Sequence, residues 1–169
     1  PSVTVKEDGA VIFYLYAPAA KIVQVAGLGG YFTNKKIDLM PDGQGGFFAE
    51  VQDFHWGMHY YFWYVDGVRI CNPYAGISYG CFAAINTFEV QEKNVDFYFA
   101  KDIPHGTVSI CKYVSKVSSH LKECYVYTPY GYEEGDERYP VLYLQHGVGE
   151  SETGWIWQGK TNFIMDYLI

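Results

Sequence analysis

The sequence lacks an excess of positive charge, a long apolar run and closely spaced cysteines. It has 12 Lys plus Arg against 19 Asp plus Glu, so its formal net charge is −7. Nucleic acids and anionic membranes are bound by concentrated positive charge, which argues against both as partners. No apolar run approaches the roughly 18 residues that a membrane-spanning helix needs. Residues 1–4 lack the charged and apolar regions with which a signal peptide begins, so the sequence does not show in which compartment the protein acts.

The four cysteines, Cys71, Cys81, Cys111 and Cys124, form no C-x-x-C pair and have no histidine at metal-ligand spacing. Structural zinc sites depend on such spacing, so neither a metal nor any other cofactor is predicted. We expect buried free thiols, because an unpaired cysteine packs as a small apolar residue.

Hydrophobic residues make up 49% of the chain and aromatic residues 19%, which excludes a disordered tail. In the first half, short apolar and aromatic runs alternate with Gly-, Pro- and Asp-rich turns, and Asp66-Gly67 is typical of a two-residue hairpin turn. The predicted strands are residues 11–16, 22–26, 47–51, 60–65, 68–71 and 87–90. They predict a β-sandwich over residues 1–91, with Phe13, Leu15, Val23, Val25 and Phe62 in its core.

A polar segment with Pro and Gly, residues 92–105, is interpreted as a linker. Beyond it, residues 107–115 and 124–128 are predicted to form a hairpin in which Cys111 lies opposite Cys124. Residues 141–146 are predicted to form a strand that is buried on both faces, and residues 162–169 an amphipathic helix. Hairpin, buried strand and helix are the opening of an α/β fold.

This second half resembles the start of the catalytic domain of carbohydrate esterase family one. The matching residues are Pro104-His105-Gly106-Thr107, Pro129-Tyr130-Gly131-Tyr132, Tyr139-Pro140, residues 141–146, Gly147-Val148-Gly149, Trp155 and residues 158–166. The family includes feruloyl and acetylxylan esterases and has the α/β-hydrolase fold. The resemblance implies a mainly β chain: an immunoglobulin-like (early-set) sandwich over 1–91, then an incomplete α/β-hydrolase domain over 106–169.

The resemblance assigns an oxyanion loop to Gly147 and Val148, with the Val148 amide as the favoured donor to the tetrahedral oxyanion. His146 is interpreted as a residue that shapes the loop. Trp155 and Trp157 either line the substrate cleft or pack the loop against the first helix. The catalytic Ser, acid and His are expected beyond Ile169, so that this stretch alone is expected to be inactive.

Gly76-Ile77-Ser78-Tyr79-Gly80 satisfies G-x-S-x-G, but it lies before the oxyanion loop and between strand-like runs. A nucleophile elbow needs a strand before it and a helix after it, so Ser78 is not predicted to be catalytic.

The first half resembles the modules of carbohydrate-binding module family forty-eight, on residues 13–23, Gly27, residues 61–67 and Asn72-Pro73. Tyr31, Phe32 and Trp56 are candidates for stacking on sugar rings, whereas Trp63 is predicted to lie in the core. Two alternatives to the esterase remain open: a carbohydrate-binding module and a purely structural domain. The expected partners are a polysaccharide or acylated oligosaccharide, the remainder of the esterase domain, and a second copy through the hydrolase segment. Secretion or a cell-surface location follows from the resemblance.

Overall fold

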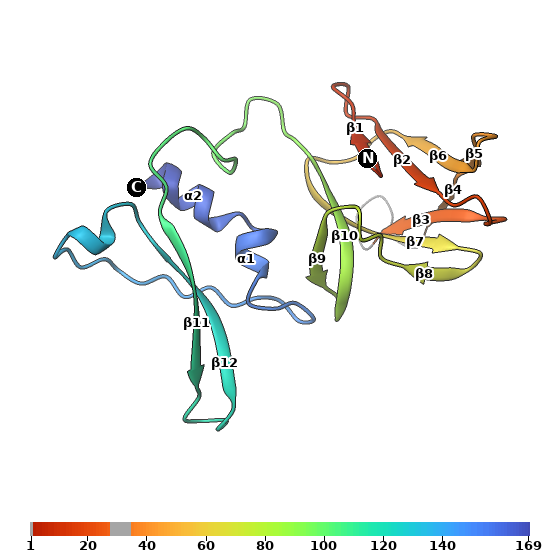
Figure 1. Cartoon of the computed structure of the whole chain (residues 1–169). Helices are drawn as coiled ribbons and strands as arrows, with labels where there is room; N and C mark the ends of the chain where they lie inside the picture. Colours follow the sequence, from red (N-terminus) through yellow and green to blue (C-terminus); the bar gives the residue numbers. More distant parts are fainter. Residues whose placement is uncertain (1, 28–34) are drawn as a thin grey trace. The chain divides into compact units, whose positions relative to one another are not determined.

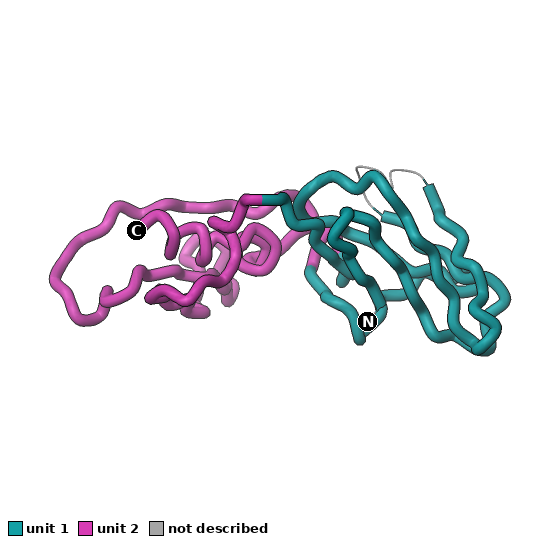
Figure 2. The backbone as a smooth tube through the Cα atoms, turned by 90° about the horizontal axis from the view of Figure 1, so that it is seen from above, with its two compact units in different colours: residues 1–78, 83–93 teal, residues 79–82, 94–169 magenta. Residues whose placement is uncertain are grey.

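The computed structural model describes residues 2–27 and 35–169 and is mainly β, with all strand pairs antiparallel in the described part (Figure 1). It divides into two compact units (Figure 2). Unit 1 contains residues 1–78 and 83–93, and unit 2 contains residues 79–82 and 94–169. The predicted domain bounds stay a prediction.

Unit 1 contains two antiparallel sheets. The first has the strand order β1-β2-β6-β5, in which β1 is Val3–Val5, β2 Val11–Tyr16, β6 Gly46–Val51 and β5 Met40–Pro41. The second has the order β4-β3-β7-β10-β9, with β4 Lys36–Asp38, β3 Val23–Gly27, β7 Gly57–Val65, β10 Ala83–Val90 and β9 Ile77–Gly80. Strand β8, Val68–Ile70, also pairs with β7 but lies outside this strand order.

The two sheets share one core. Strands β2 and β6 contribute Val11, Phe13, Phe47, Ala49 and Val51, and strands β3, β7 and β10 contribute Val23, Val25, Tyr61, Trp63, Phe88 and Val90. Phe13 stands at its centre, with its ring centroid 5.5 Å from those of both Tyr61 and Phe88 in edge-to-face arrangements. The predicted burial of Trp63 is confirmed, since its side chain is fully buried.

Phe62 is buried but does not belong to this core cluster. Successive side chains of a strand point to opposite faces, so Tyr61 and Trp63 occupy the core face of β7 and Phe62 the other. There it lies opposite Ala26 of β3, and the Arg69 guanidinium stands over its ring at 4.5 Å. Leu15 is only partly buried against the core. The predicted burial of Phe62 is confirmed, although it lies on the face of β7 opposite the core cluster, whereas Leu15 is only partly buried.

The Asp66-Gly67 turn is confirmed. Both residues have the positive φ that a primed turn requires, 48° and 84°, and β7 and β8 pair up to Val65 and Val68 on either side of it. The Asp66 carboxylate also accepts hydrogen bonds from the amides of Ile22 and Lys21, at 2.8 and 2.9 Å, and these bonds lower its pKa. The turn thereby ties β7 to the residues before β3.

Two asparagines, Asn72 and Asn86, fix the position of the segment between β8 and β9 through hydrogen bonds. The fully buried Asn86 accepts a hydrogen bond from the Asn72 amide at 2.8 Å and donates to the Asn72 carbonyl at 2.9 Å. Asn72 in turn donates from its side chain to the Ser2 hydroxyl at 2.8 Å. Buried amides of this kind are costly unless every group has a partner, so the pair fixes where this segment meets the sheet.

In unit 2, β11 (Thr107–Val114) and β12 (Leu121–Thr128) form a two-stranded sheet, followed by a short 3₁₀ helix η2 (Tyr132–Glu134) and the helices α1 (Gly154–Trp157) and α2 (Thr161–Leu168). The predicted hairpin and the C-terminal helix are confirmed. Cys111 lies directly opposite Cys124, as predicted.

All four cysteines are free thiols, but none is buried: Cys81 and Cys111 are exposed and Cys71 and Cys124 are half-buried. The prediction of buried thiols was wrong because Cys81 lies between β9 and β10 and Cys111 lies on a two-stranded sheet.

Residues 141–146 do not form the predicted strand, and they are not buried on both faces. They have no regular secondary structure, and the side chains of Val141, Leu142, Tyr143 and Leu144 are exposed. A β-strand forms only where its backbone N–H and C=O groups pair with those of another strand. No described strand pairs with this segment. An apolar run does not reveal whether the chain supplies strands that pair with it.

Within the described residues, no helix has both the length and the apolar character needed to cross a membrane.

Candidate oxyanion site

The segment assigned to the oxyanion loop is a tight turn between residues 141–146 and α1. The Glu150 amide donates to the Gly147 carbonyl at 3.2 Å, and the Glu150 carboxylate accepts from the Gly147 amide, also at 3.2 Å. Gly149 has a φ of 80°, a backbone conformation that side chains other than that of glycine rarely adopt. The two hydrogen bonds join the first and last residues of the turn, Gly147 and Glu150.

Val148 lies at the tip of this turn. Its side chain is 92% exposed, and its amide has no hydrogen-bond partner among residues 2–27 and 35–169. The Gly147 amide is occupied by Glu150, so the turn leaves two amides without a partner among the described residues, those of Val148 and Gly149, and the resemblance favours Val148. An exposed backbone N–H held in a rigid turn is the kind of group that stabilises an oxyanion.

His146 contributes one of its ring nitrogens to the turn. Its Nδ1 lies 2.9 Å from the Gly147 carbonyl oxygen. A carbonyl can only accept a hydrogen bond, so Nδ1 carries the proton in this contact. This geometry agrees with the interpretation of His146 as a loop-shaping residue.

Trp155 and Trp157 both lie on α1. The Trp155 indole N–H donates to the Gln145 carbonyl at 3.0 Å, which holds α1 against the residue that precedes His146. Both rings are still about half exposed, 43% for Trp155 and 53% for Trp157. Trp155 therefore connects the loop to α1, and whether its partly exposed ring also lines a substrate cleft stays a prediction.

Residues 79–82 belong to the same unit as this turn. The Phe82 amide donates to the Gly149 carbonyl at 2.8 Å, and the Gln158 side-chain amide donates to the Tyr79 carbonyl at 3.3 Å. Sequence reasoning missed this neighbour, because Phe82 and Gly149 are far apart in the chain and no motif links them.

The candidate sugar-binding residues are not assembled into one described site. Tyr31 and Phe32 lie outside the described residues. Trp56 belongs to unit 1, just before β7, and its side chain is 52% exposed, whereas Trp155 belongs to unit 2. The roles of all four residues stay predictions.

Ser78 lies within β9, is buried, and is followed by strand β10 rather than by a helix. This is not the context of a nucleophile elbow.

Unit 2 contains a second polar cluster, which sequence reasoning also missed. His105 Nδ1 lies 2.7 Å from Asp166 Oδ2, while Asp166 Oδ1 accepts from the Gly106 amide at 2.7 Å and the Tyr127 hydroxyl at 2.8 Å. The other His105 nitrogen, Nε2, is 2.8 Å from the Lys101 carbonyl. Both ring nitrogens are thus engaged, so this His–Asp pair has no free nitrogen with which to activate a nucleophile.

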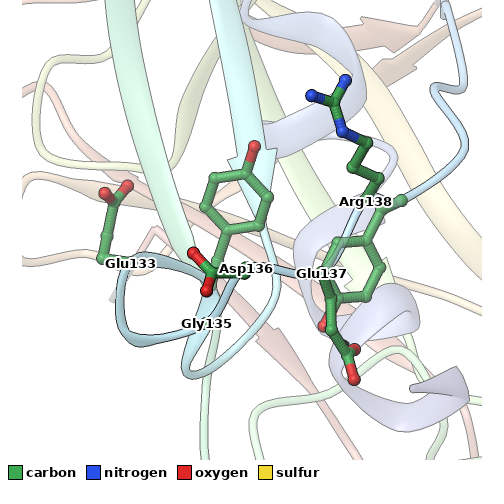
Figure 3. A pocket seen from close by; sticks show the side chains of 7 residues that line it. Glu133, Gly135, Asp136, Glu137 and Arg138 are labelled. Atoms are coloured by element: carbon green, nitrogen blue, oxygen red, sulfur yellow. Dashed lines mark hydrogen bonds between the residues drawn. The ribbon is translucent and has the colours of Figure 1, made fainter.

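An open hollow of about 530 Å³ lies over residues 132–139 (Figure 3). It is lined by Tyr132, Glu133, Gly135, Asp136, Glu137, Arg138 and Tyr139. All seven residues are exposed, so the hollow lacks the enclosed apolar lining of a small-molecule site. No cluster of three or more His, Cys, Asp or Glu side chains suited to a metal occurs in the described part of the chain.

No protein-family model matches the chain. The chain is similar to an endo-1,4-beta-xylanase/feruloyl esterase of Xylanibacter ruminicola, at 38% identity over 172 residues. This match covers 98% of the chain and 23% of the relative, so the chain spans less than a quarter of that protein's length. The chain is therefore related to a carbohydrate-active enzyme whose name includes an esterase activity.

Two solved structures are also similar: the catalytic module of the multi-modular glycogen-degrading pneumococcal virulence factor SpuA with an inhibitor, and a product complex of the same factor. Both have a TM-score of 0.42; the identities are 18% and 20%, and the matches cover 63% and 62% of this chain and 18% and 13% of those chains. A likeness at this level carries no argument about this chain.

Proposed function

We propose that this chain is part of a serine carbohydrate esterase that hydrolyses feruloyl or acetyl esters on a plant polysaccharide such as xylan. The observation that carries the proposal is the 38% identity to an enzyme named for xylanase and feruloyl esterase activity, because the match runs through both units. Unit 1 would be an immunoglobulin-like accessory module and unit 2 the start of an α/β-hydrolase domain.

The proposed contribution of unit 2 to the reaction is one oxyanion donor. When a serine attacks the ester carbonyl, the carbonyl oxygen becomes an oxyanion, and a backbone N–H already aimed at it lowers the barrier without reorganisation. The exposed, unoccupied amide of Val148 supports this role, and the Glu150 bond to Gly147 supports the rigidity that it needs. The nucleophile, acid and His of the triad are proposed to lie in sequence beyond Ile169.

A backbone donor is tested by removing its N–H. In the natural full-length protein, Val148→Pro is expected to lower kcat for p-nitrophenyl acetate by about 10²–10³-fold, the usual effect of losing one oxyanion-hole donor. Val148→Ala keeps the N–H and is expected to retain most of the activity. Equal activity of the two variants would refute the role of this amide, and a wild-type protein without esterase activity would refute the proposed function.

A second candidate function is sugar binding by unit 1, favoured by the half-exposed ring of Trp56 outside the core. Pyranose C–H groups pack well on such a ring. Pull-down of the 169-residue chain on insoluble xylan and on starch tests it, with Trp56→Ala expected to abolish retention. A chain that neither polysaccharide retains would leave unit 1 with a structural role.

The proposed substrate is a polysaccharide outside the cell, so a secreted or cell-surface location belongs to the same proposal.

A further inference from the structure

Phe82 is a large apolar residue that is 74% exposed, yet its position is fixed. Its amide donates to the Gly149 carbonyl at 2.8 Å. A Cβ placed on Gly149 would come within 3.0 Å of two carbons of the Phe82 ring, so the ring itself lies against the Gly149 backbone. An exposed aromatic ring is thus held one residue away from the candidate oxyanion donor, Val148.

The backbone at this point is strained. Cys81 and Phe82 have φ values of 51° and 66°, in the left-handed region that neither side chain favours. Glycine, asparagine or aspartate would adopt this turn more easily. Burial of the ring does not offset the strain, since most of the Phe82 side chain is in solvent. Strain of this kind is concentrated at ligand sites, where the surrounding structure maintains it.

A second contact fixes the position of residues 79–82. The Gln158 side chain, just after α1, donates to the Tyr79 carbonyl at 3.3 Å. Residues 79–82 are therefore held at Tyr79 by Gln158 and at Phe82 by Gly149. The position of Phe82 relative to the turn 147–150 is set by these hydrogen bonds and by the contact of its ring with Gly149.

We propose that Phe82 is a specificity-determining residue that binds the aromatic ring of the acyl group, so that the site prefers hydroxycinnamoyl esters to acetyl esters. This inference rests on the proposed esterase function. An ester whose carbonyl oxygen accepts from the Val148 amide places its acyl substituent next to Gly149 and the ring that covers it. Aromatic rings attract one another at centroid separations of about 4.5–7 Å. An acetyl group has no ring to make this contact.

The chemistry of the surface favours an acyl group over a sugar. The side chains of Val148 and Phe82 are exposed and apolar and offer no hydrogen-bond partner to sugar hydroxyls, so a sugar could contact Phe82 only by stacking on its ring. An aromatic acyl group, in contrast, gains by leaving water against such a surface.

The test compares two esters in the natural full-length protein. Phe82→Asn removes the ring, and asparagine accepts the left-handed backbone, so the turn is preserved. We expect kcat/KM to fall about tenfold for methyl ferulate, in the range expected for the loss of one aromatic contact, and less than about twofold for p-nitrophenyl acetate. Phe82→Tyr keeps the ring and is expected to restore the value for methyl ferulate. Tyr130→Asn, at a residue that is 70% exposed in the same unit, is the matched control and is expected to change neither value.

The remaining outcomes all contradict the inference. Equal losses for both esters would show a general effect on the loop, and no loss for either would show that the ring does not touch the substrate. With a feruloylated oligosaccharide assayed as a third ester, a loss confined to it, with methyl ferulate unaffected, would mean that Phe82 binds the sugar. A wild-type protein that hydrolyses neither ester would refute the proposed function itself. Since Phe82→Asn relieves backbone strain, its thermal unfolding midpoint is expected to equal or exceed that of the wild type.

Discussion

His105 and Asp166, which stand 61 positions apart in the sequence, are joined by a contact of 2.7 Å between Nδ1 and Oδ2. The second ring nitrogen of His105 lies 2.8 Å from the Lys101 carbonyl. A carboxylate and a carbonyl both accept hydrogen bonds, so the ring satisfies both contacts only when both nitrogens are protonated. His105 is therefore protonated in this geometry, and it links Asp166 of α2 to the Lys101 carbonyl.

The pKa values of the two groups agree with this geometry. The hydrogen bond to Asp166 raises the pKa of His105, and the bond to the Lys101 carbonyl adds to the effect. Burial acts to raise the pKa of Asp166, but hydrogen bonds from the Gly106 amide, His105 and Tyr127 outweigh it, so the pKa is lowered.

We expect a pH-dependent contribution of His105 to the stability of unit 2. A group whose pKa is raised on folding stabilises the folded state fully below its unfolded pKa, about 6.5. That contribution is lost as the pH rises through the higher, folded value. The gap in thermal unfolding midpoint between wild type and His105→Gln is therefore expected to be larger at pH 6 than at pH 9. His120, for which no hydrogen bond or ion pair of the ring is found in the described part of the chain, provides the control His120→Gln. A gap independent of pH would show that His105 is neutral in the folded protein.

The sequence predicted the strands of unit 1 wherever a run was long and bounded by turn residues. The runs that became β2, β6 and β7 are examples. It missed β1, β4, β5 and β9, of two to four residues, because so short a segment shows too little alternation to be recognised. The Asp66-Gly67 turn was predictable because its chemistry is local: two residues supply both positive φ angles.

Interactions between distant segments could not be predicted in this way. Nothing local to Asp166 indicates that it accepts hydrogen bonds from the residues at the start of β11, and nothing local to Phe82 indicates that it lies on Gly149. The strand predicted over residues 141–146 does not form for a related reason. A strand needs partner strands, and an apolar run does not reveal whether the chain provides them. The oxyanion role of Gly147 and Val148 came from a family resemblance and stays a prediction; the structure shows that these residues belong to a turn.

The turn between β7 and β8 gives a prediction on stability. Gly67 has a φ of 84°, and a Cβ at this position would meet nothing within 4 Å, so the cost of a side chain is purely conformational. Gly67→Ala is expected to lower the free energy of unfolding by about 1–2 kcal/mol, the penalty of the left-handed region for a residue with a Cβ. Urea unfolding followed by circular dichroism measures it. Gly67→Asn is the matched control and is expected to cost less, because asparagine visits this region more readily. Equal losses in the two variants would contradict this explanation.

The opposition of Cys111 and Cys124 predicts a disulfide under mild oxidation. The Ser115 amide donates to the His120 carbonyl, and counting back through the one-to-one register makes the cysteines a hydrogen-bonded pair, with Cα atoms about 5.5 Å apart. This separation suits a disulfide. With oxidised glutathione, two thiols lose two protons and two electrons as one S–S bond forms, and the glutathione disulfide is reduced to two thiols.

Thiol counting with Ellman's reagent in denaturant is the measurement for this disulfide. The count is expected to fall from the four free thiols of the structure to two. Cys111→Ser is expected to block the reaction, whereas Cys71→Ser is expected to permit it. A wild-type count that stays at four after oxidation would contradict the prediction.

The exposed apolar run before the oxyanion turn predicts self-association of the 169-residue chain. Val141, Leu142 and Tyr143 are 70%, 66% and 88% exposed, and no described strand pairs with their backbone. An unpaired extended segment with apolar side chains is a template for pairing with a second chain. Sedimentation velocity is expected to show dimers or larger species, and Leu142→Lys to shift the distribution to the monomer because it places a charge in the contact.

Val117→Lys is the control for that experiment, since Val117 is 99% exposed but lies in the turn between β11 and β12, away from the run. It adds the same charge and is expected to leave the distribution unchanged. If both lysine variants dissociate the oligomer equally, net charge and not strand pairing controls association. If the wild-type chain is a monodisperse monomer with amide protection over residues 141–144, the segment finds its hydrogen-bond partners within the chain, and its proposed role as an open edge is wrong.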